Sequence, residues 1–214
     1  MSNFEVVIKA IDEANQGSPR KTIVDGLERS YENVYSERMS RTLARMYPEA
    51  SELLKIAARA QHIRRWDIPR GDFPLGPKGY NQWRKTCREH HGEIMRSIMS
   101  ENGYSEDAIM QVGMYLKKEK LKKNDDSQAL ENVVDVVFLE FYWDEFVEKF
   151  PQYDEDKLID IVGKTLLKMS SHGHEAALAL ELPPATLKIV GAALEKQKDK
   201  LAALAAAEEN RQNV

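Results

Sequence analysis

The sequence predicts an all-α protein. Apolar side chains recur at helical spacing through most of the 214 residues, and no alternating run is long enough to suggest a sheet. With 42% hydrophobic and 31% charged residues, the composition is that of a globular protein able to bury a real core. We expect one bundle of about seven to eight helices in residues 1–194, followed by an alanine-rich helical tail at residues 195–214.

Apolar periodicity and the breakers between periodic segments place each helix in order. The expected helices cover residues 4–15, 22–46, 49–65, 77–102, 105–118, 127–149 and 154–170, with a last one after Pro183-Pro184. Asn102-Gly103 is a typical helix stop. The charged stretch at 117–126 and the KMSSHGH stretch are expected as turns, the latter exposing His172 and His174 to solvent.

Charge and cysteine content narrow the class of protein. A net charge of −4 argues against bulk nucleic-acid binding, so an RNA partner is not favoured. Cys87 is the only cysteine, which excludes an intrachain disulfide and suits a reducing compartment. The first residues lack the pattern of a signal peptide, and no run approaches the roughly eighteen apolar residues that span a bilayer. We expect a cytoplasmic protein without a membrane partner.

One stretch, residues 61–85 (QHIRRWDIPRGDFPLGPKGYNQWRK), differs from its surroundings and is called the basic loop below. Guanidinium groups bind phosphate and carboxylate, aromatic rings stack on bases or cations, and Pro and Gly shape the backbone. The candidate substrate-binding residues are Arg64, Arg65, Trp66, Arg70, Lys78, Tyr80, Trp83 and Arg84. The alternative is a structural clasp, in which these arginines pair with the acids at positions 131, 135 and 140.

Histidines and acids near this loop indicate a metal site. His62 ends one expected helix and His91 lies within the next, and imidazole is a good ligand for transition metals. Glu131 and Asp135 are four residues apart, on one face of an apolar helix where ionised carboxylates need a compensating partner. We predict that His62, His91 and Asp135 hold a divalent ion, either Mn, Fe or Zn, with Glu131 or Glu140 as general base. Satisfied core histidines and acids paired with arginines are the alternative.

The same residues resemble a known family. The stretch AARAQHIRRWDIPRGDFPLGPKGYNQWR, then HHGE, LENVVDVVFLEFYWDEF and KLIDIVGKTLLKMS, is similar to the domain of unknown function 4202 over residues 22–185. The resemblance implies one all-helical domain and brings no established activity. The family pattern matches His91-Gly92-Glu93 better than His90, and it has an acid where this chain has Asn132.

A more distant similarity concerns the HD metal phosphohydrolases, in which histidines and a later aspartate hold a metal ion. The order His62, His91, Asp135 is similar, but Gly92 stands where the signature aspartate would be. We therefore expect a metal-dependent hydrolase acting on a phosphorylated or other anionic small molecule, a nucleotide among the candidates. Three alternatives stay open: a non-catalytic module that binds an anion or RNA, a diiron-type oxygenase on the same ligands, and a helical interaction protein.

Overall fold

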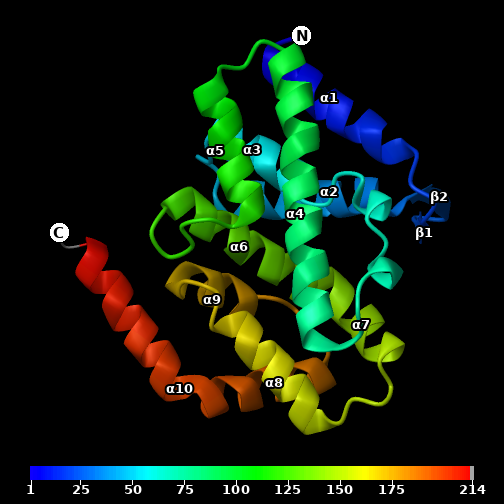
Figure 1. The fold of residues 1–214 in the computed structure, drawn as a ribbon. Helices are drawn as coiled ribbons and strands as arrows, with labels where there is room; N and C mark the ends of the chain where they lie inside the picture. Colours follow the sequence, from blue (N-terminus) through cyan, green and yellow to red (C-terminus); the bar gives the residue numbers. More distant parts are fainter. Residues whose placement is uncertain (213–214) are drawn as a thin grey trace. The chain divides into compact units, whose positions relative to one another are not determined.

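The computed structural model describes residues 1–212 and confirms the all-α class. Over this range the chain forms ten α-helices and one short β-hairpin (Figure 1). The helices group into two compact units, one comprising Met1–Leu130 and the other beginning at Glu131. None of the helices in the described range combines the length and apolar character that a bilayer crossing requires.

Serine residues cap the start of several helices in the first unit. Its elements are α1 (Asn3–Gln16), β1 (Lys21–Val24), β2 (Leu27–Ser30), α2 (Tyr31–Met46), α3 (Glu52–Arg59), α4 (Gly76–Glu101), α5 (Glu106–Lys117) and the first residues of α6 (Asp125–Val137). The hydroxyls of Ser2, Ser30, Ser51 and Ser105 each accept a backbone N–H of the helix that follows. Helix α5 packs along α4, and α3 packs against α2 and α5 (Figure 1).

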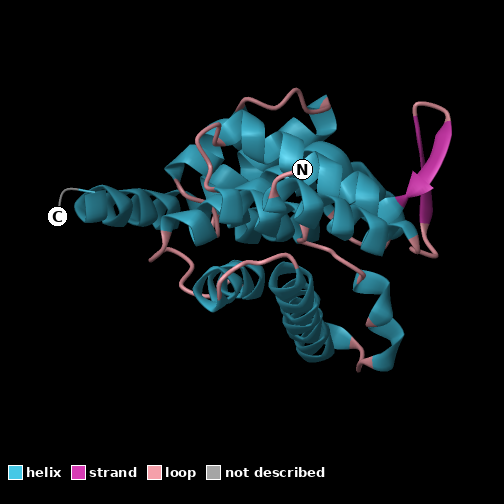
Figure 2. Ribbon diagram, turned by 90° about the horizontal axis from the view of Figure 1, so that it is seen from above, coloured by secondary structure: helices cyan, strands magenta, loops and turns pink. Residues whose placement is uncertain are grey.

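The expected helix at 22–46 is wrong over its first nine residues, which form the hairpin. Val24 pairs with Leu27 across a two-residue turn, and Asp25 and Gly26 adopt φ angles of 51° and 77°. Asp-Gly with both residues in the left-handed region is the typical closure of such a hairpin. Ile23 and Leu27 are spaced four apart, as in a helix, yet both are exposed. Figure 2 shows the hairpin extending from the neighbouring helices.

The second unit continues α6 and adds the C-terminal helices. Its elements are a π-helical turn, η3 (Phe138–Tyr142), then α7 (Trp143–Lys149), α8 (Glu155–Leu166), α9 (Ser171–Leu178) and α10 (Pro184–Gln212). The single helix expected at 127–149 is thus interrupted by a π turn. Helix α10 packs on α8, and the Glu208 carboxylate near its end accepts bonds of 2.9 Å from both the backbone N–H and the hydroxyl of Ser171.

The turn expected around the KMSSHGH stretch holds only for residues 168–170, because α9 begins at Ser171. His172 is exposed, as expected. His172 and His174 both lie in this helix. The ring Nε2 of His174 is 2.7 Å from the Leu166 carbonyl oxygen, so His174 bonds to the protein rather than standing in solvent. Gly173 of this helix approaches Asn132 so closely that a Cβ there would lie 2.6 Å from the Asn132 Oδ1.

Candidate functional site

The basic loop is held in one conformation by bonds to its backbone. Arg64 adopts a left-handed φ of 47°, and its N–H donates to the buried Asn15 side chain at 3.0 Å. The Trp83 indole N–H donates to the Ile68 carbonyl at 2.8 Å. At Gly79, a Cβ would fall 1.8 Å from the Pro74 carbonyl oxygen, so only glycine permits this approach of loop and helix. The loop is therefore shaped rather than flexible.

Two of the predicted substrate-binding arginines stabilise this loop conformation. The Arg70 guanidinium donates to the carbonyl oxygens of Phe73 and Pro74, each at 2.9 Å. Arg64 forms an ion pair with Asp67 at 2.9 Å, and the same Asp67 oxygen lies 3.0 Å from the Nε2 of His90. Arg64 and Arg70 thus have partners within the loop, which differ from the acids at positions 131, 135 and 140 that the clasp alternative named.

Two other arginines lie against aromatic rings. The Arg65 guanidinium is 4.5 Å from the centroid of the Trp83 ring, and that of Arg84 is 5.8 Å from the centroid of Tyr80. Across residues 1–212, neither Arg65 nor Arg84 forms an ion pair. The Tyr80 side chain is 44% exposed. These cations keep their charge available beside an accessible ring, which is the arrangement that recognition of an anion with an aromatic part requires.

Trp66 and Lys78, the remaining predicted substrate-binding residues, differ in exposure. Trp66 is half-buried within the short 3₁₀ turn η1 (Arg65–Asp67), and Lys78 is exposed in the first turn of α4. Neither position adds a specific contact to the cations described above.

The first unit also brings His62 and His91 together, and they are called the histidine pair below. Their ring centroids are 6.3 Å apart, and the His62 ring stacks on Tyr35 with centroids 3.8 Å apart and planes inclined by 13°. His91 is 1% exposed. Within the part of the chain that the structure describes, neither of its ring nitrogens has a hydrogen-bond partner. A buried polar group without a partner is uncommon and asks for an explanation.

Both histidines are held neutral. Burial lowers the pKa of His91 well below its ordinary value, assisted by the charge of Arg65. Burial is also the main cause of the low pKa of His62. The further contributions to that low pKa come, in order, from Arg65, His91, Lys118 and Arg84. Neutral imidazole can ligate a metal ion or accept a hydrogen bond, whereas imidazolium can do neither.

The second unit contains Glu131 and Asp135, called the carboxylate pair below. Both are about 2% exposed, and the spacing of four places them on one face of α6 as predicted. The Lys168 ammonium pairs with Glu131 at 3.1 Å and also with Asp135. Although burial opposes the charge of Lys168, the carboxylates of Asp135 and Glu131 raise its pKa above the ordinary value.

Lys168 was missed by the sequence-based interpretation, which considered the arginines as the cations for these acids. The sequence did contain one signal for such a residue: two buried carboxylates on one helix face need a compensating cation. Lys168 follows the apolar end of α8, but its distance from Glu131 along the chain conceals the pairing. Glu140, the other predicted general base, lies in the π turn η3 and is half-buried.

A complete metal-ligand cluster is not visible in the described range. Among residues 1–212, no three His, Cys, Asp or Glu side chains form a group that could hold a metal ion. The donor chemistry of the histidine pair nevertheless fits a transition metal, because His91 presents two buried nitrogens that nothing else binds. His62 and His91 belong to the first unit and Asp135 to the second, so the predicted three-ligand set stays a prediction.

The fold and these clusters define an all-α protein with a basic, histidine-containing candidate site. A family model described as a domain of unknown function, DUF4202, matches residues 5–190. The chain belongs to this family, as the motifs of the basic loop predicted, and the match extends beyond the expected 22–185 at both ends. Comparison with curated proteins and with solved structures finds no match.

Proposed function

We propose that this protein is a metal-dependent hydrolase of a phosphorylated or other anionic small molecule, with nucleotides among the candidates. The observation that carries the proposal is His91, a neutral imidazole with 1% exposure and two nitrogens that lack partners among residues 1–212. Leaving such a group unsatisfied destabilises a fold unless something that the polypeptide does not supply binds to it.

In this proposal His62 and His91 provide the imidazole ligands of a divalent Mn, Fe or Zn ion. Bound in this way, the ion supplies a water molecule of lowered pKa and stabilises negative charge on the substrate. Stacking on Tyr35 orients the His62 ring. Asp135 remains the predicted carboxylate ligand, and Glu131 and Glu140 remain the candidate general bases.

The substrate side of the proposal rests on the arginines that loop contacts leave available. Arg65 and Arg84 are free of ion pairs within residues 1–212, and guanidinium forks match phosphate oxygens. The exposed Tyr80 ring can stack on the organic part of the ligand. Arg70 has a structural role in the loop in this proposal, since two of its nitrogens already donate to the carbonyl oxygens of Phe73 and Pro74.

Metal content tests the proposal directly. Protein purified without chelator should contain close to one equivalent of a transition metal, and addition of Mn²⁺, Fe²⁺ or Zn²⁺ to stripped protein should raise Tm. His91→Gln should abolish both effects, and it should also abolish hydrolysis of aryl phosphates or nucleotides. His172→Gln, at a half-exposed position, is the matched control. Substoichiometric metal together with an unchanged Tm in all three ions would overturn the proposal.

A second candidate function is a non-catalytic module for an anionic ligand. It is favoured by a specific observation: Lys168 already neutralises the carboxylate pair, so these acids have a structural role without any metal ion. This candidate predicts ligand binding that falls steeply with salt and survives His91→Gln. If His91→Gln loses ligand binding, and if binding by the stripped wild-type protein is restored by metal while that of the variant is not, the hydrolase is favoured instead.

A further inference from the structure

A cavity of about 550 Å³ lies within the second unit, between α7 and the first turns of α8 and α10. Helices α8 and α10 lie side by side (Figure 1). Two ion pairs connect them, Lys188 with Glu155 and Lys196 with Asp160, each at 2.7 Å. The volume is that of a small-molecule site. The residues that line the cavity differ from all those assigned above to the hydrolase.

Part of the cavity wall is apolar. Trp143 lines the cavity and is 3% exposed, and its ring stacks on Phe146 with centroids 5.9 Å apart. This contact holds the indole in place whether or not a ligand is present. Val147, Leu158 and Ile189 line the same cavity. Together these side chains form a surface against which the hydrocarbon part of a ligand can be buried.

One polar side chain of the wall is buried without a partner. Thr186 lines the cavity and is 4% exposed, and its hydroxyl takes part in no hydrogen bond within residues 1–212. Buried hydroxyl groups are normally satisfied by the protein or by a molecule bound beside them. Thr186 therefore has both a donor and an acceptor left for a ligand in the cavity.

The exposed part of the wall is acidic. Asp144 and Glu148 lie four residues apart on one face of α7, and both are exposed. Within the described range neither of them forms an ion pair. Lys188, the cation of this wall, already pairs with Glu155. The lining residues thus have a net charge of −2, and the two carboxylates of α7 repel each other unless a cation binds between them.

We propose that this cavity binds a linear aliphatic amine with two or more ammonium groups, the chemistry of a polyamine. The ammonium groups pair with Asp144 and Glu148, the methylene chain lies against Trp143 and Ile189, and one N–H donates to the Thr186 hydroxyl. Residues four apart on a helix have Cβ atoms about 5–6 Å from each other, which suits two ammonium groups joined by a four-carbon chain. The proposal goes beyond the proposed function, since it needs neither a metal ion nor an anion.

Two other occupants would match the acids but not the rest of the cavity. A magnesium ion retains water and would leave the apolar wall unused, and among residues 1–212 no three His, Cys, Asp or Glu side chains form a metal-binding group. A basic segment of a partner protein needs an extended groove. The simplest alternative is that Asp144 and Glu148 are only solvated, which predicts amine binding that is weak and independent of Thr186.

Calorimetry at low salt and in excess chelator measures the binding of spermidine, putrescine and butylamine. We expect the affinity to fall in this order, with the number of ammonium groups. Asp144→Asn and Glu148→Gln should each weaken spermidine binding about tenfold, as expected for the loss of one charge-assisted hydrogen bond. Asp156→Asn, at an exposed carboxylate of α8 outside the cavity wall, is the matched control. It should change the affinity less than about twofold, because salt and solvent screen exposed charges.

Two further variants test the cavity itself rather than its charge. Thr186→Val removes the hydroxyl and should weaken spermidine binding about fivefold. Its Tm should stay the same or rise, because the folded protein loses no hydrogen bond. Ala185→Phe, at an exposed position of the wall, should fill the cavity and abolish binding.

A wild-type protein that binds none of the three amines at millimolar concentration would overturn the proposal. So would wild-type affinity in both Thr186→Val and Ala185→Phe, since surface charge alone would then attract the amine. Measured without chelator, tighter binding of Mg²⁺ than of putrescine would assign the acids to a metal ion. Tighter binding of a trilysine peptide than of spermidine would assign them to a basic protein segment, and either result overturns the amine site. These measurements do not depend on hydrolysis, so the two proposals fail separately.

Discussion

The histidine pair of the first unit and the carboxylate pair of the second solve the same physical problem in opposite ways. Each places two ionisable side chains where water is largely excluded. The carboxylates keep their charge because Lys168 lies against both. The histidines give up their charge instead, since burial and nearby cations lower the pKa of each.

The difference separates a pair whose charge is neutralised by a neighbouring side chain from a pair that is neutral and keeps hydrogen-bonding capacity. In the carboxylate pair, a side chain of the same unit provides the compensating charge. In the histidine pair, His91 has no hydrogen-bond partner among residues 1–212, and the nearby charge that most lowers its pKa is that of Arg65. The carboxylate charges are neutralised within their unit, which contributes to folding, whereas the neutral His91 imidazole has two ring nitrogens with capacity left for a ligand.

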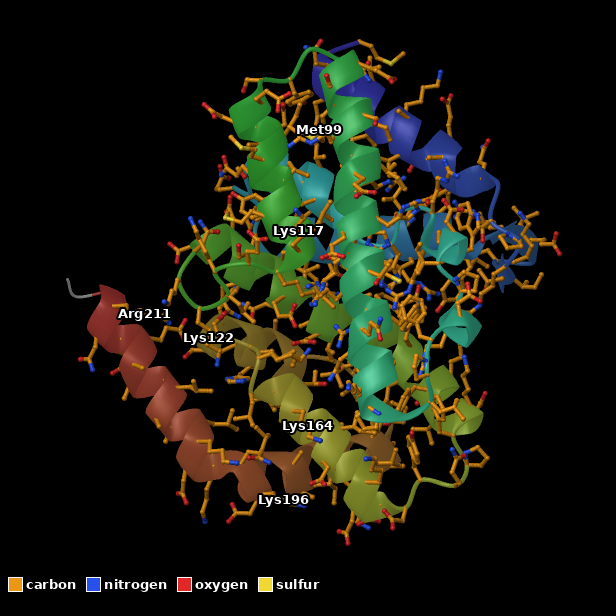
Figure 3. The ribbon with its side chains drawn as sticks, viewed as in Figure 1. Met99, Lys117, Lys122, Lys164, Lys196 and Arg211 are labelled. Carbon is orange, nitrogen blue, oxygen red and sulfur yellow. The ribbon has the colours of Figure 1, made fainter. Side chains whose placement is uncertain are left out.

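The largest expected effect is the loss of Lys168. Lys168→Met should lower the free energy of unfolding by about 2–3 kcal/mol, because two buried carboxylates lose their cation. This value is below that for a fully buried ion pair, since 35% of the Lys168 side chain is exposed. Urea denaturation measures it. Lys164→Met, at an exposed position of α8 (Figure 3), is the control and should be almost neutral. Similar losses in both variants would remove the contrast between the two pairs.

An effect of pH comes next. The folded-state pKa values of His62 and His91 lie below the ordinary value, so below pH 6.5 the unfolded chain binds more protons than the folded one. Stability should therefore fall as the pH falls, by about 2 kcal/mol between pH 7 and 5.5 for the two histidines together. Unfolding curves in chelator measure this, and the double variant His62→Gln/His91→Gln should flatten the dependence. A wild-type curve that is already flat would contradict neutral burial.

The smallest effect distinguishes the arginines within the basic loop. Arg70→Ala should cost about 1 kcal/mol, because the carbonyls of Phe73 and Pro74 lose a donor in a partly exposed place. Arg84→Gln should change stability by less than about 0.5 kcal/mol, as is usual for a side chain without a structural bond, while it weakens anion binding. Thermal unfolding with and without pyrophosphate measures both. The opposite ranking would reassign Arg84 to the loop and Arg70 to the ligand.

Local patterns predicted several features correctly. The helix expected at 77–102 is observed as α4 at Gly76–Glu101, because periodicity and the Asn102-Gly103 stop agree there. Glu131 and Asp135 share one helix face, as a spacing of four requires. The hairpin was missed although Asp25-Gly26 is its usual signal, because Ile23 and Leu27 imitate helical spacing. The π turn at Phe138–Tyr142 has no simple sequence signature and was missed as well.

The sequence by itself determined the all-α class, most helix positions, the family and the chemical types gathered near the basic loop, because helix formation depends on neighbours within four residues. Tertiary structure alone decided the partners. In the folded protein, Lys168 pairs with the carboxylate pair, and Arg64 and Arg70 contact other atoms of the basic loop. The His174 ring lies against the Leu166 carbonyl oxygen. The ring centroids of His62 and His91 lie 6.3 Å apart. The physical reason is that burial and pairing depend on helix packing, which joins residues that the chain separates by tens of positions.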